Sequence, residues 1–148
     1  MGTWYVGPFD NDVAMEFFDE IEVTPDDLVL SRLSSVLTAV VERPGRVELD
    51  EGHLAVAAAG LVAAGRSRSA AIGNPSVDEW LSLHRPVVEP AAARIALAAL
   101  DRVAGPDSEW MDLWATTDSR KAVQERIAGL RAELTGAAVS TADAGISG

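Results

Sequence analysis

Residues 24–45 read TPDDLVLSRLSSVLTAVVERPG, and no other stretch of the chain indicates the fold class as clearly. Thr24 is a favourable N-cap, Pro25 suits the first position of a helix, and the two aspartates that follow interact favourably with the helix dipole. Apolar residues then recur along one helical face: Val29, Leu33, Val36, Leu37, Val40 and Val41. Pro44-Gly45 ends the segment, so the stretch predicts an amphipathic helix.

The same pattern of start signal, apolar stripe and Gly or Pro stop recurs on both sides of this stretch. Further helices are predicted from the Asp10–Asp12 cluster to Ile21, over about 50–64, 76–84 and 90–103, after Ser108, and over about 118–134. We therefore expect an all-α fold, a single compact bundle of about six to seven helices with short loops. We expect this domain to span residues 1–134, with 1–10 as a docked, extended N-terminal arm and 135–148 as a flexible tail.

The composition describes a soluble helical protein with a core of small side chains. Of the 148 residues, 48% are hydrophobic and 5% aromatic, so Ala, Val and Leu must fill most of the core. The chain has no cysteine, which excludes disulfides and thiolate sites. No apolar run reaches the roughly 18 residues that cross a bilayer, and the start lacks a secretory signal pattern. We expect a cytoplasmic protein that does not bind membranes.

The net charge of −11 indicates which partners the protein suits. Phosphate backbones are bound through lysine and arginine, and this chain has one lysine, so we expect no nucleic-acid binding. The acidic excess lies in residues 1–60, where the basic residues are Arg32, Arg43 and Arg46. Five of the acids surround the first turn between helices: Asp19, Glu20, Glu22, Asp26 and Asp27. Such a half could meet a basic protein partner or form a solvated face.

The first residues, MGTWYVGPFDND, concentrate the candidate binding residues of the chain. Trp4 and Phe9 could form a recognition patch or anchor the arm in the core, which is where large aromatic side chains usually lie. Asp10, Asn11, Asp12 and Glu16 could offer oxygens to a divalent cation, but the spacing of a calcium loop is absent. We favour helix capping over metal binding for this cluster, and we expect no metal and no cofactor.

Two blocks of sequence resemble an uncharacterised family. The opening Gly2-Thr3-Trp4…Gly7-Pro8-Phe9-Asp10-Asn11-Asp12…Ala14 is similar to the start G-x-W-G-x-G-P-F-D-N-D-x-A of a domain of unknown function common in actinobacteria. Glu109-Trp110-Met111-Asp112-Leu113-Trp114, with the helix ending Leu130–Leu134, resembles its closing pattern. The resemblance implies an all-helical domain, and it carries no catalytic residues to this chain.

No pattern of catalytic residues is recognisable in the chain. His53 follows Asp50 and Glu51 at a helix start, where we expect a solvated residue, and His84 suits the C-terminal end of a helix. Neither histidine is accompanied by a nucleophile elbow, a zinc-binding pair or a phosphate loop. We therefore assign no catalytic residue and expect a protein that is not an enzyme.

Three functional hypotheses follow. The first is a small acidic protein that acts by binding another protein, in an immunity, antitoxin-like or regulatory role. The second is a metal-assisted hydrolase that uses Asp10, Asp12 and Glu16, with His53. The third is a small-molecule binder with a pocket lined by Trp80, Trp110 and Trp114. A homodimer through the Ala-rich helices at 55–64 and 91–99 is also possible.

Overall fold

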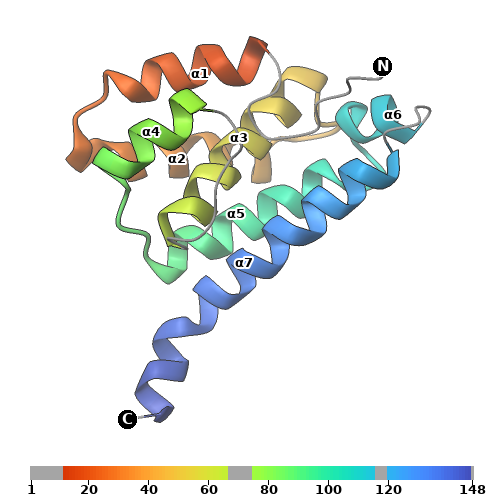
Figure 1. Ribbon diagram of the computed structural model, residues 1–148. Coiled ribbons are helices and arrows are strands. Elements are labelled where there is room, and N and C mark those ends of the chain that lie inside the picture. The colour runs from red at the N-terminus through yellow and green to blue at the C-terminus, as the bar shows by residue number, and fades with distance from the viewer. Residues whose placement is uncertain (1–11, 67–74, 116–119, 148) are drawn as a thin grey trace.

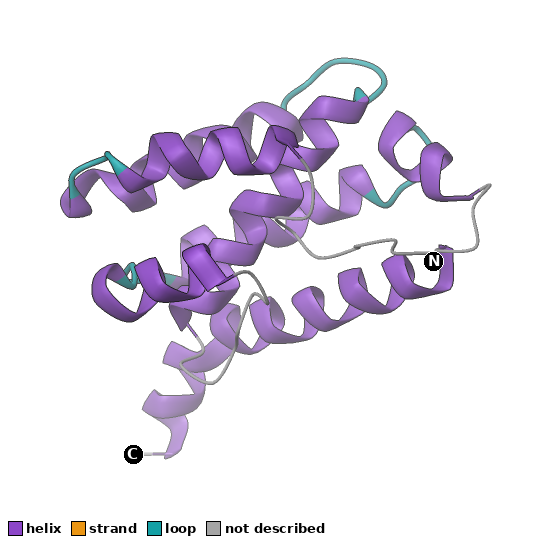
Figure 2. Ribbon diagram, turned by 45° about the horizontal axis from the view of Figure 1, so that its top comes forward, coloured by secondary structure: helices purple, strands orange, loops and turns teal. Residues whose placement is uncertain are grey.

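Helices account for nearly all of the ordered secondary structure. The computed structural model describes residues 12–66, 75–115 and 120–147. Within them lie seven helices: α1 (Asp12–Glu22), α2 (Asp26–Val41), α3 (Leu49–Arg66), α4 (Pro75–His84), α5 (Pro90–Val103), α6 (Glu109–Ala115) and α7 (Arg120–Ser147). These ranges contain no strand, as Figure 2 shows, and one isolated parallel bridge joins Val47 to Ser108. The predicted all-α bundle is confirmed.

Helix α3 is the centre of the bundle. It packs against α1, α2, α5, α6 and α7, and Figure 1 shows it between the layer of α1 and α4 and the layer of α5 and α7. Every residue from 55 to 64 is buried. A helix that is apolar on all sides must be enclosed by others, and its many alanines let those neighbours come close.

Helices α5 and α7 form the second layer. They lie side by side and run in opposite directions (Figure 1). Helix α7 contributes a stripe of buried residues at helical spacing, and α5 contributes a face made mostly of alanine. The buried residues of α7 are Val123, Ile127, Leu130 and Leu134.

The Ala-rich segments that suggested a homodimer belong to this internal packing. Residues 55–64 are buried in the centre of the monomer. In the other segment, Ala92, Ala93, Ala96 and Ala99 are buried as well. The two alanine faces therefore pack inside the core of one chain, and a homodimer stays a prediction.

The start of α2 differs in detail from its prediction. Pro25 is the N-cap and no side chain caps the helix, so the assignment of Thr24 as the cap is wrong. The Thr24 hydroxyl instead donates to the Glu20 carbonyl at 2.7 Å and satisfies the end of α1. A hydroxyl in a tight turn can serve either helix, which is why the pattern alone misassigned it.

The predictions for the two chain ends are tested to different extents. Residues 1–10, the predicted docked arm, lie outside the described residues. Helix α7 continues to Ser147, well past the predicted helix end at Leu134, and its last turns project beyond the other helices (Figure 1). The flexibility predicted for residues 135–148 stays a prediction. Among the helices of the described ranges, none is both long enough and apolar enough for a bilayer crossing.

Candidate functional site

The predicted N-terminal site is only partly within the described chain. Trp4, Phe9, Asp10 and Asn11 lie outside the described residues. Asp12 and Glu16 lie one turn apart on α1, and both are exposed. Over the residues that the structure describes, no three His, Asp or Glu side chains lie close enough together to hold a metal ion.

The three tryptophans of the proposed pocket do not meet. Trp80 of α4 packs edge-on against Phe18 of α1, with ring centres 5.9 Å apart. Trp110 and Trp114 of α6 pair with each other at 6.0 Å. Figure 1 places α4 and α6 on opposite sides of α3, so one pocket lined by all three is wrong. Trp80 and Trp110 are each 5% exposed, and they belong to two separate parts of the core.

His53 is a packed residue of α3, and the expectation of a solvated side chain is wrong. The Trp110 indole Nε1–H donates to His53 Nδ1 at 3.2 Å. Burial lowers the pKa of His53, and the negative charge of Asp50 partly opposes that shift. A neutral imidazole that accepts a hydrogen bond from a buried indole acts here as a structural acceptor.

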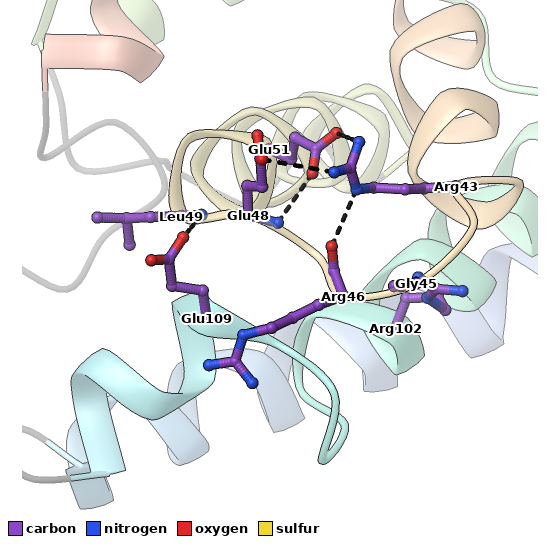
Figure 3. A network of polar contacts seen from close by, with 8 residues as sticks. All are labelled: Arg43, Gly45, Arg46, Glu48, Leu49, Glu51, Arg102 and Glu109. Atoms are coloured by element: carbon purple, nitrogen blue, oxygen red, sulfur yellow. Dashed lines mark hydrogen bonds and ion pairs between the residues drawn. The ribbon is translucent and has the colours of Figure 1, made fainter.

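A network of polar contacts links α6 to the start of α3 (Figure 3). Arg43 donates to the Arg46 carbonyl and to Glu51, each at 2.9 Å. Glu51 accepts from the Glu48 backbone N–H at 2.8 Å, and Glu109 of α6 accepts from that of Leu49 at 2.9 Å. These carboxylates satisfy the first amides of α3, so the network is an anchor between elements.

The turn between α1 and α2 carries a cluster of exposed carboxylates. We call residues 19–27 the acidic turn. All five of its carboxylates are exposed, and so is Val23, at 82%. Glu20 pairs with Arg32, and Asp26 pairs with His84. Among the described residues, no ion pair engages Asp19, Glu22 or Asp27.

A groove of about 480 Å³ adjoins the acidic turn. It runs between the start of α2, the end of α4 and the chain that leads to α5, and we call it the α2–α4 groove. Its described lining residues are Asp26, Asp27, Leu30, Leu83, His84, Arg85, Pro86 and Val87. Leu83 is 72% exposed and Val87 is 85% exposed. The groove thus combines carboxylates with large apolar side chains in contact with water.

A histidine–carboxylate pair forms part of the lining of this groove. His84 Nδ1 lies 3.0 Å from Asp26 Oδ1 and 3.2 Å from Oδ2. The imidazole also stacks on Trp80, with ring centres 5.8 Å apart and an angle of 23° between the planes. Trp80 and Asp26 therefore fix the orientation of the ring. His84 at the end of α4 fits the position that its sequence context predicts.

The groove places acid–base groups beside apolar side chains. A histidine oriented by a carboxylate is one half of an acid–base pair, and a hydrolase also needs a nucleophile or an activated water. The described lining offers no hydroxyl, thiol or amine.

Sequence reasoning recognised the acids of this surface and missed its apolar part. Leu83 and Val87 lie next to buried residues in the sequence, and nothing in the pattern separates Val87 from a core residue. Asp26 and His84 are 58 residues apart, and no sequence signal joins them. One signal was present: Leu83 falls off the helical face that carries Val77, Trp80 and Leu81.

The structure shows a small all-helical protein with an acidic, partly apolar surface at the acidic turn and the α2–α4 groove. The chain belongs to the family described as a domain of unknown function, DUF4259, which matches residues 2–126. The match includes the N-terminal block and the segment 109–114 on which the resemblance rests, and it ends before Leu130–Leu134. No curated protein and no solved structure matches the chain.

Proposed function

We propose that this protein acts by binding another protein through the acidic turn and the α2–α4 groove. The observation that carries the proposal is the exposure of Val23 in the acidic turn and of Leu83 and Val87 in the groove that adjoins it. Large apolar side chains that gather in water at one place are typical of a surface that a partner covers. At the left end of Figure 1, the turn between α1 and α2 lies beside the end of α4.

The charge of the surface favours a basic partner. Asp19, Glu22 and Asp27 have no ion pair among the described residues, and the net charge of −11 adds to their field. Opposite charge on a partner speeds association and excludes acidic competitors. An acidic protein that covers a basic one fits an immunity, antitoxin-like or regulatory role.

The hydrolase hypothesis has less support. It needs Asp12 and Glu16 to converge with at least one further ligand. In the described chain both side chains are exposed on α1, and His53 receives a hydrogen bond from Trp110. Helix capping explains acids at the start of α1 without a metal.

Capture from a cell lysate at low and high salt tests the proposed function. The variant D19N/E22Q/D27N should retain several-fold less partner than the wild type, and high salt should weaken wild-type capture. The control variant E42Q/D107N/E125Q removes the same charge from exposed residues elsewhere, none of them ion-paired within the described chain. If the two variants lose equal amounts of partner, or neither loses any, this surface is not the binding site.

A further inference from the structure

The exposure of Val87 is built into the chain that connects α4 to α5. Residues 85–89 are not helical, and burial alternates along them: Pro86 and Val88 are buried while Val87 and Glu89 are exposed. Pro86 and Val88 pack directly on Gly65 of α3, where an added Cβ would lie 2.8 Å from a Val88 methyl. Because side chains alternate in extended chain, fixing these two neighbours turns Val87 outward.

The exposure of Leu83 on α4 is fixed in a similar way. Trp80 and Leu81 are buried and orient α4, which leaves Leu83 in the last turn exposed. Leu30 of α2 also lines the groove and is partly buried against the core. Three apolar side chains from three segments therefore meet in a space of about 480 Å³. Sites that bind small molecules and peptide side chains lie within about 300–1,000 Å³.

Some of the charged side chains that line the groove already have partners within the protein. Both carboxylate oxygens of Asp26 lie within hydrogen-bond distance of His84. The Arg85 guanidinium donates to the Ala64 carbonyl of α3, which directs it toward the core helix. Asp27 has no ion pair among the described residues, so it is the lining carboxylate that remains available to a cation.

We infer that the α2–α4 groove binds a segment of the partner in which a large apolar side chain stands next to a lysine or arginine. The apolar side chain lies between Leu83 and Val87, and the cation pairs with Asp27. This inference rests on the proposed function, since it names the part of the partner that the surface recognises. An acidic segment is excluded because its charge would meet Asp27 and the neighbouring acidic turn.

Fluorescence anisotropy with two labelled synthetic peptides tests the inference. One 12-residue peptide alternates leucine and lysine, and the other replaces each leucine by serine at the same charge. The full-length protein should bind the leucine peptide more tightly. The variant L83S/V87S should bind the leucine peptide about fivefold to tenfold more weakly, a typical effect of removing apolar anchors. Its affinity for the serine peptide should not change.

Two controls separate this inference from the proposed function. The variant L113S removes an exposed apolar residue from α6, 42% exposed, and should leave both peptides unaffected. Unchanged melting temperatures establish that the variants are folded. If L83S/V87S binds the leucine peptide like the wild type while D27N weakens both peptides, the apolar recognition is overturned and charge-based binding stands. If D19N/E22Q/D27N binds both peptides and the lysate partner like the wild type, the proposed function itself fails.

Discussion

Gly52 is the residue that allows α6 to approach α3. A Cβ at this position would lie 2.5 Å from Trp110 Cγ and 2.6 Å from Cδ1. Alanine is the better helix former by about 0.5–1 kcal/mol, yet overpacking of a closed contact costs about 1–3 kcal/mol. We therefore expect Gly52→Ala to lower the free energy of unfolding in a urea titration.

Gly129 provides the matched control on α7. A Cβ built there meets no described atom within 4 Å, so Gly129→Ala should raise the free energy of unfolding by up to about 1 kcal/mol. The two substitutions are chemically identical and should act in opposite directions. If both variants were stabilised equally, Trp110 would not be in close steric contact with Gly52.

His53 should make stability depend on pH in a defined direction. Burial lowers the pKa of His53 below 6.5 in the folded protein. As the pH falls, His53 is therefore protonated at a higher pH in the unfolded chain than in the folded protein. The contribution of His53 to stability is therefore complete above pH 6.5. It should fall as the pH drops through 6.5 towards the lower pKa of the folded state. Chemical denaturation at a series of pH values measures this decline.

The variant His53→Gln isolates this effect from the other titrating groups. Glutamine can accept the indole hydrogen bond but carries no titrating proton. Relative to the wild type, the variant should gain stability as the pH falls below 6.5. A stability difference that stays constant across this range would mean that His53 titrates alike in both states.

At the scale of elements, Ser108 determines the start of α6. Its side chain is fully buried, and its hydroxyl accepts a hydrogen bond from the Met111 backbone N–H at 3.2 Å. Loss of an N-cap of this kind costs about 0.5–2 kcal/mol. We expect Ser108→Ala to lower the melting temperature, whereas Ser35→Ala on the exposed side of α2 should not. Equal responses of the two variants would contradict the capping role.

The end of α7 gives a prediction about which part of the helix stabilises the bundle. The apolar stripe of this helix ends at Leu134, which is fully buried. The sequence beyond Thr135 consists mostly of Gly, Ala, Ser and Thr, and its helix projects beyond the rest of the bundle in Figure 1. A chain truncated after Thr135 should keep the melting temperature of the full chain within a few degrees. A large drop would show that the last turns contribute to the core.

Helix positions were predictable because each helix carries local signals. The stripe Val29, Leu33, Leu37 and Val40 is buried as predicted, and Pro90 opens α5. The errors fall where two elements compete for one group. Thr24 lies between α1 and α2 and serves α1, while His53 depends on Trp110, which is 57 residues away. Such choices depend on packing that a local pattern does not contain.

At the scale of the whole molecule, the acidic half was predictable and the site within it was not. Net charge is a sum over residues and needs no fold. The groove exists because α3 anchors Pro86 and Val88 while α4 brings His84 to Asp26. The sequence instead drew attention to candidate binding residues between Trp4 and Glu16. Of those candidates, Asp12 and Glu16 are described, and both lie exposed on α1.

The most direct test of partner binding at this surface is site-specific photocross-linking in cells. A benzophenone amino acid placed at Val87 or Val23, both more than 80% exposed, should join the protein covalently to a basic partner. The same group at Glu125, on the part of α7 that lies away from the acidic turn in Figure 1, should give no such product. Cross-linking from Glu125 with none from Val23 or Val87 would contradict binding through the acidic turn and its groove.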